Sequence, residues 1–165
     1  MLDAPKLSQL HRAHTAMLTR EKTRQIGAAP MFAGASHANQ ALLAATARLV
    51  HVADGEVVIA EGDQTTSAYL IWTGMVHVVN DAGDVLAVFN AGELVGEAAA
   101  ATDTPTYRFE RTATVRAVGP CELYQIPADS LRRLIEAEPV VRDRVRGLIQ
   151  ERIGIDQIRQ HVKSV

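Results

Sequence analysis

The stretch from residue 48 to residue 126 constrains the fold of this chain more than any other part of the sequence. It holds short segments rich in Val, Ile, Tyr and Phe, separated by turn-forming pairs such as Asp54-Gly55 and Gly119-Pro120. Strands that recur about every 8–12 residues predict an antiparallel sandwich or barrel, and the lack of long helices between them argues against a parallel sheet. The segments that carry the pattern are RLVHV, EVVIAEG, AYLIWTG, MVHVVN, DVLAVFN, ATVRAV and CELYQI.

Helical patterns flank the predicted strands on both sides. Residues 5–26 and 37–46 combine helix-forming residues with apolar positions at helical spacing. After the last strand, Pro127 and Pro139 each stand where a helix begins, since proline is tolerated in the first helical turn. One short helix is predicted inside the strand region, over the alanine-rich residues 96–104. The sequence therefore predicts a mainly β fold with flanking helices.

Composition narrows the class of protein. Of the 165 residues, 47% are hydrophobic, which is enough for a folded core, and the single cysteine, Cys121, excludes an internal disulfide. No apolar run reaches the ~18–20 residues of a membrane span, so we expect a cytoplasmic protein. The net charge of -2 gives no overall basic footprint for nucleic acid. Fourteen arginines against three lysines are typical of a GC-rich bacterial genome.

The short internal helix is suited to binding an anion. Gly96 allows close approach of the backbone, and a helix N-terminus presents unpaired N–H groups. Arg111 is one of only four basic residues in 31–131, a region with twelve acidic residues. Arginine suits bidentate contact with phosphate, and the Glu97 carboxylate can accept a sugar hydroxyl. These three residues indicate a pocket for a small phosphorylated sugar, with a surface ion pair as the alternative.

Short motifs follow one another along the chain in a recognisable order. They are Asp54-Gly55-Glu56-Val57-Val58, Glu61-Gly62-Asp63, Tyr69-Leu70-Ile71, Gly74-Met75-Val76, Ala91-Gly92-Glu93, Val95-Gly96-Glu97-Ala98, Arg111-Thr112-Ala113-Thr114-Val115 and Cys121-Glu122-Leu123. This order resembles the cyclic nucleotide-binding domain of protein kinase A regulatory subunits, cyclic nucleotide-gated channels and catabolite activator-type regulators. The resemblance implies an eight-stranded antiparallel jelly-roll-type β-barrel. It divides the chain into an N-terminal helical segment (1–30), the domain with its C-terminal lid helix (31–155) and a tail (156–165).

The resemblance implies a role for each residue around the short helix, which would form part of a phosphate-binding cassette. Glu97 would receive the ribose 2′-hydroxyl, and Arg111 would pair with the cyclic phosphate. Thr112 would add contacts to the phosphate or the base, which leaves cGMP open as a ligand beside cAMP. The backbone N–H groups of Ala98 and Ala99 would complete the anion cradle.

The resemblance also implies how the base is held and what the domain does. Val78, Ala87 and Phe89 would pack against the base, and Arg152 on the C-terminal helix would touch it once that helix closes. The implied function is a cyclic nucleotide sensor that regulates a partner protein, without a cofactor and without a catalytic role. The apolar stripe of the last helix leaves open whether it packs on its own barrel or forms a homodimer.

The segment between Glu97 and Arg111 departs from the family pattern. It is longer, it lacks a proline directly before Arg111, and it places Glu110 beside the predicted phosphate ligand. Arg108 is the alternative ligand if the register is shifted. An interaction scaffold that has kept the fold and lost its ligand is therefore the alternative function.

Other functions have weaker support. His11 and His14 lie three residues apart on a predicted helix, a spacing that can bind metal, but no third ligand is evident and we predict no metal site. No nucleophile paired with a base indicates an enzyme. A DNA-binding regulator would need a helix-turn-helix after the long helix, for which we expect no room before residue 165.

Overall fold

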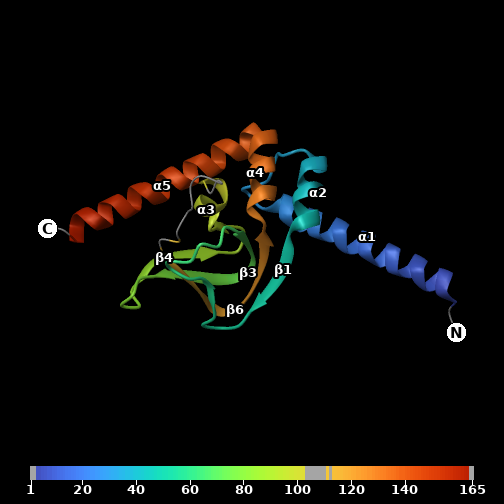
Figure 1. Ribbon diagram of the computed structural model, residues 1–165, viewed down its shortest axis with the longest axis horizontal. Coiled ribbons are helices and arrows are strands. Elements are labelled where there is room, and N and C mark those ends of the chain that lie inside the picture. The colour runs from blue at the N-terminus through green and yellow to red at the C-terminus, as the bar shows by residue number, and fades with distance from the viewer. Residues whose placement is uncertain (1–2, 103–110, 112, 164–165) are drawn as a thin grey trace.

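The computed structural model describes residues 3–102, 111 and 113–163. Within these residues, five helices and six strands form one body from which a helix projects on either side (Figure 1). In chain order the elements are α1 (Ala4–Ala28), α2 (His37–Thr46), β1 (Arg48–Val52), β2 (Val57–Ile59), β3 (Ala68–Val79), β4 (Val85–Asn90), β5 (Leu94–Val95), α3 (Glu97–Thr102), β6 (Thr114–Ile126), α4 (Ala128–Ala137) and α5 (Pro139–Lys163).

The described strands form one antiparallel sheet. β6 and β3 lie at its centre with β1 and β4 outside them, β2 pairs with β6, and β5 pairs with β3, so among the described residues the pairing does not close into a barrel. Six described strands stand where the resemblance implied eight. β3 and β6 each take up two of the seven segments named from the sequence, and β5 is a further two-residue strand. Gly74 lies inside β3 at a shift of register against β6 and has a φ of +97°. The strand bends at this glycine instead of ending there.

Capping side chains fix where the first two helices begin. The Asp3 carboxylate accepts a hydrogen bond from the backbone N–H of Lys6 (3.1 Å) at the start of α1, and the Ser36 hydroxyl caps α2 in the same way. Each cap satisfies a backbone donor that the helix itself leaves unpaired. The helices predicted at 5–26 and 37–46 are confirmed to within two residues at each end.

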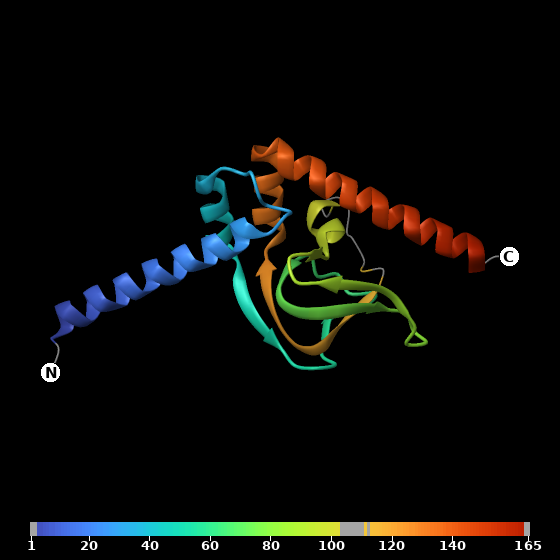
Figure 2. The ribbon, with the colours of Figure 1, turned by 180° about the vertical axis from the view of Figure 1, so that it is seen from behind.

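The two longest helices are attached to the body in different ways. α1 and α5 have 25 residues each and extend in opposite directions from the sheet (Figures 1 and 2). α1 buries only Thr23 and Ile26, near its C-terminal end. α5 buries Val141 and Val145 in its first two turns and then passes over α3. The side chains of α1 that are more than half exposed include Leu7, Leu10, Met17 and Leu18.

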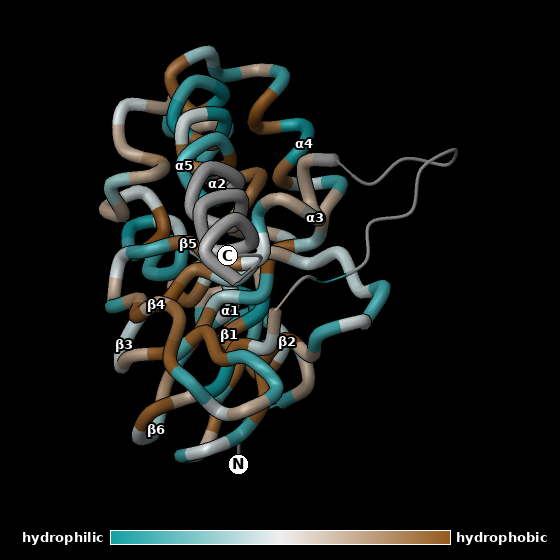
Figure 3. Tube along the Cα trace, turned by 90° about the vertical axis from the view of Figure 1, so that its left-hand side faces the viewer, coloured by the Kyte–Doolittle hydropathy of each residue, from teal (hydrophilic) through white to brown (hydrophobic). Residues whose placement is uncertain are grey.

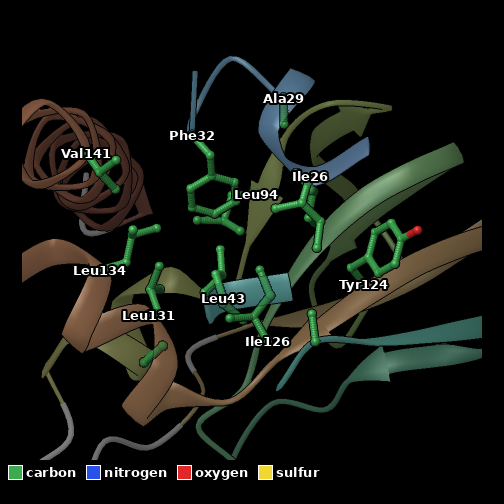
Figure 4. Packing of buried hydrophobic residues seen from close by; sticks show 14 of the residues in the cluster. Ile26, Ala29, Phe32, Leu43, Leu94, Tyr124, Ile126, Leu131, Leu134 and Val141 are labelled. Atoms are coloured by element: carbon green, nitrogen blue, oxygen red, sulfur yellow. The ribbon is translucent and has the colours of Figure 1, made fainter. Parts of the chain in front are cut away.

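Two cores meet at β5. One core lies where the helices pack against the sheet (Figure 4), and the other lies along the strands, where hydrophobic positions recur in Figure 3. Leu94 is buried in the first core and Val95 in the second, so β5 is held from both sides. The chain therefore leaves β5 and enters α3 in a fixed position. The helical core includes Ile26, Phe32, Leu43, Ile126, Leu131, Leu134 and Val141.

Candidate functional site

Gly96 begins the site, directly after β5. Its φ is +77°, and a Cβ at this position would lie 2.9 Å from Nη1 of Arg111 and 3.1 Å from the carbonyl oxygen of Ser67. Real Cβ atoms avoid contacts this short, and a left-handed backbone is unfavourable for any other residue type. Glycine is therefore required here so that the Arg111 guanidinium can lie against the backbone.

Arg111 is a buried cation that neutral acceptors hold in place. Only 4% of the Arg111 surface is exposed to solvent. Nη2 donates to the Ser67 carbonyl oxygen (2.7 Å) and Nη1 donates to the Gly96 carbonyl oxygen (3.2 Å). Nε donates to Oγ1 of Thr65 (3.4 Å). Burial lowers the pKa of the Arg111 guanidinium, yet arginine remains charged in proteins, so the site carries a fixed positive charge.

Glu97, the first residue of α3, is the complementary buried anion and is 1% exposed. Its Oε2 forms an ion pair with Nη1 of Arg152 on α5. Nη2 of Arg152 also donates to the Leu94 carbonyl oxygen (2.8 Å). Burial raises the pKa of Glu97, while the charge of Arg152 opposes that rise. The anionic side of the site is therefore closed by a side chain from another element.

An apolar surface lies beside this ion pair. The Arg152 guanidinium carbon is 4.3 Å from the centroid of the Phe89 ring on β4, a cation–π contact. Ala87 lies two residues before Phe89 and therefore on the same face of β4, and it pairs with Val78 of β3. Val78 and Phe89 are both partly buried against the strand core. The three residues predicted to contact the base thus lie on two neighbouring strands.

Comparison with known protein families matches residues 49–138 to the cyclic nucleotide-binding domain. The matched residues make up more than half of the chain. The chain belongs to the cyclic nucleotide-binding domain family. The resemblance predicted from the sequence motifs is therefore confirmed, and the domains of this family are regulatory.

The relatives that match this cyclic nucleotide-binding domain by sequence are much longer proteins, and the chain spans only a small part of their length. Lysophospholipase nte1 of Neurospora crassa is 30% identical over 108 residues, which cover 63% of this chain and 7% of the relative. The structure of cAMP-bound PfPKA-R matches with a TM-score of 0.72 at 17% identity, over 87% of this chain and 48% of that one. The sensor domain of the regulator DNR from Pseudomonas aeruginosa matches with a TM-score of 0.64 at 24% identity, over 78% and 91%. These structural matches show a shared fold.

Apart from Val78 and Ala87, which pair on β3 and β4, the residues predicted for the nucleotide site fall into three groups. Contacts or chain neighbours join Gly96, Glu97, Arg111, Arg152 and Phe89 into one continuous cluster. Ala98 and Ala99 lie in the first turn of α3, where the cradle was predicted. Thr112, together with the alternative ligand Arg108 and the competing Glu110, lies outside the described residues.

Sequence reasoning missed the groups that hold the two arginines. Thr65 and Ser67 surround Arg111, and the Leu94 carbonyl oxygen binds Arg152. The Thr65 hydroxyl was a visible signal. The Ser67 and Leu94 contacts use backbone carbonyl groups, which leave no trace in a sequence. Arg152, expected at the base, contacts Glu97 and the Phe89 ring.

The remaining candidates give no second site. His11 and His14 are exposed on α1, and the described part of the chain holds no group of three or more His, Cys, Asp or Glu suited to a metal ion. Cys121 is buried, and its Sγ lies 3.1 Å from the Met75 carbonyl oxygen. A buried free cysteine of this kind packs as a small apolar residue. Over the same ranges, none of the helices combines the length and the apolar content that crossing a bilayer requires.

Proposed function

We propose that this chain is a sensor for a cyclic nucleotide, in the first place cAMP, and that α5 reports the binding to a partner. One observation carries the proposal. Two opposite charges, Glu97 and Arg111, are buried on either side of Gly96 in a domain of the cyclic nucleotide-binding family. Burying charges is costly, so their retention at one point of the fold favours a specific use for both.

The chemistry of a cyclic nucleotide suits these two charges. Its phosphate is a single anion, and its ribose carries a free 2′-hydroxyl. Arginine has five N–H donors, so the three bonds that Arg111 makes to its described partners leave it able to contact phosphate oxygens as well. The Glu97 carboxylate would accept the 2′-hydroxyl. Further contacts would come from Val78, Ala87, Phe89, Thr112 and the backbone of Ala98 and Ala99.

The attachments of α5 provide a route for the signal. Nη1 of Arg144 donates to the carbonyl oxygens of Pro30 (2.9 Å), Met31 (3.3 Å) and Ala33, in the segment between α1 and α2. A shift of α5 on ligand binding would therefore reach α1. The exposed side of α1 or the C-terminal part of α5 would then meet a regulated partner or a second copy of this chain. Light scattering with and without cAMP tests the homodimer.

Isothermal titration of the full chain with cAMP and with cGMP tests the proposal. Arg111→Ala is the test variant, and Arg133→Ala, an exposed arginine on α4, is the matched control. We expect micromolar or tighter binding by the wild type and the control, and binding at least about a hundredfold weaker by Arg111→Ala. Equal binding by all three proteins would place the phosphate elsewhere and refute the assignment of Arg111.

A ligand-free interaction scaffold is the second candidate, and one observation favours it. Both buried charges already have protein partners, Arg111 through Ser67 and Gly96, and Glu97 through Arg152. In that case neither cAMP nor cGMP would bind to the chain, although cooperative thermal unfolding would show that the chain is folded. Binding of a regulated partner would then be unchanged in Arg111→Ala.

A further inference from the structure

Three contacts hold the Arg152 side chain inside the candidate site. Its guanidinium pairs with the Glu97 carboxylate, donates to the Leu94 carbonyl oxygen (2.8 Å) and lies 4.3 Å above the Phe89 ring. These contacts come from α3, β5 and β4. The Arg152 side chain is 23% exposed and that of Glu97 only 1%, so Arg152 stands between the carboxylate and the solvent.

The groups that Arg152 contacts are those that a nucleotide would need. In the proposed function, the Glu97 carboxylate accepts the ribose hydroxyl and the Phe89 ring lies against the base. A guanidinium 4.3 Å above the Phe89 centroid fills the space in which a base would stack, and it also neutralises Glu97. Arg152 in this position and a bound nucleotide therefore exclude each other.

Arg152 is held less completely than a permanent structural cation would be. Its Nε is buried and has no hydrogen-bond partner among the described residues. A buried donor without an acceptor raises the free energy of the closed arrangement. The first half of α5 is anchored separately, by buried Val141 and Val145 and by Arg144. Arg152 can therefore leave the site while α5 stays attached to the body.

We propose that Arg152 is an autoinhibitory latch. Its contacts with Glu97, Leu94 and Phe89 close the site, and a nucleotide binds only to molecules in which this latch is open. The inference rests on the proposed function and adds to it how the site is regulated. It reverses the role expected from the sequence, in which Arg152 touches the bound base and increases affinity. If the latch is closed in nine tenths of the molecules, the apparent affinity falls about tenfold.

Titration of the full chain with cAMP, comparing wild type with Arg152→Gln, tests the latch. Arg146→Gln, an exposed arginine on the same helix, is the matched control. Arg152→Lys serves as a second variant, because lysine keeps a positive charge near Glu97 but cannot make the same forked and stacked contacts. Hydrogen exchange of α5 without nucleotide is measured in parallel on all four proteins.

We expect Arg152→Gln to bind cAMP about tenfold more tightly than wild type, with Arg152→Lys between them and the control unchanged. Exchange in α5 beyond Arg152 should be faster in Arg152→Gln before any ligand is added. Weaker binding by Arg152→Gln than by wild type would overturn the latch and leave the sensor intact, since Arg152 would then assist the ligand. If none of the four proteins binds cAMP, both the proposed sensor function and the autoinhibitory latch are overturned.

Discussion

The two sides of the candidate site hold their charges by different means. Arg111 is bound by two backbone carbonyl groups and a hydroxyl, all contributed by chain that belongs to the sheet or its loops. Glu97 is bound by a charged side chain on α5, a helix that reaches the site from the far end of the sequence. The cationic side is therefore part of the folded sheet, whereas the anionic side is complete only while α5 lies over it.

This difference separates a fixed contact from a conditional one. Neutral backbone partners cannot leave Arg111 without local unfolding. The partner of Glu97 can leave through rotation of one side chain or a shift of one helix. A sensor needs both kinds of contact, because ligand binding must start from a preformed group and must change something that can move.

Arg111→Ala gives the largest expected effect. It removes the fixed cation and takes away a donor from the carbonyl groups of Ser67 and Gly96, of which Gly96 keeps the N–H of Ala100 (3.4 Å). This loss should destabilise the fold by about 2–3 kcal/mol. Nucleotide affinity should fall about a hundredfold or more, since truncating one partner of a buried charged contact costs roughly 2–5 kcal/mol. Urea denaturation and calorimetric titration measure the two effects. A fully stable variant would show that the buried guanidinium contributes nothing to the fold.

Arg152→Gln should act mainly through Glu97. Loss of the neighbouring cation raises the pKa of Glu97 further, in the direction that burial already imposes. A carboxyl whose folded pKa lies above its unfolded value holds extra protons when folded, so stability falls as pH rises through that interval. We expect the fall in folding stability to continue to a higher pH in Arg152→Gln than in wild type. Carboxyl carbon NMR titration, together with urea denaturation from acid to neutral pH, measures it. A pKa for Glu97 that does not move would contradict the ion pair.

Gly96→Ala tests how closely Arg111 is fitted to the backbone. The new Cβ would meet Nη1 of Arg111 at 2.9 Å in addition to straining a backbone at φ +77°. Gly83→Ala is the matched control, because Gly83 has a φ of +83° and open space around its Cβ position. We expect a loss of about 1–3 kcal/mol for Gly96→Ala and about 1 kcal/mol for the control. Equal losses in thermal denaturation would mean that Arg111 can give way without cost.

Arg144→Ala examines a second cation held by backbone carbonyl groups, this time on α5. Its loss removes the contacts to Pro30, Met31 and Ala33 and should cost about 1–2 kcal/mol. Exposed Arg146→Ala should stay within about 0.5 kcal/mol of wild type. Denaturant unfolding of both variants makes the comparison. If the two variants are equally stable, α5 is not attached to the α1–α2 segment through Arg144.

Gly147→Ala is expected to have the smallest effect, with the opposite sign. Gly147 lies in α5 between Arg144 and Arg152, and a Cβ there would meet no atom within 4 Å. Alanine favours the helix by about 0.8–1 kcal/mol over glycine, so the melting temperature should rise slightly. A fall in thermal stability would indicate that α5 depends on flexibility at this position.

Local patterns in the sequence predicted much of the fold. Helix boundaries followed from capping residues such as Ser36, and the strand region followed from its composition and turn signals. The number of strands did not follow, because a glycine such as Gly74 marks a bend inside a long strand as readily as a turn between two. Which of the two occurs depends on pairing with β6, a contact between distant residues.

The sequence by itself determined the family, the short helix after Gly96 and the identity of the two buried charges. Each of these depends on residue types at short spacing, which a linear reading can detect. Only the tertiary structure decided what those charges contact. Ser67 and Gly96 accept hydrogen bonds from Arg111 through backbone oxygens. Every residue carries such an oxygen, so the residue type does not predict the contact. Arg152 lies 55 residues from Glu97 and meets it only because α5 folds back across the sheet.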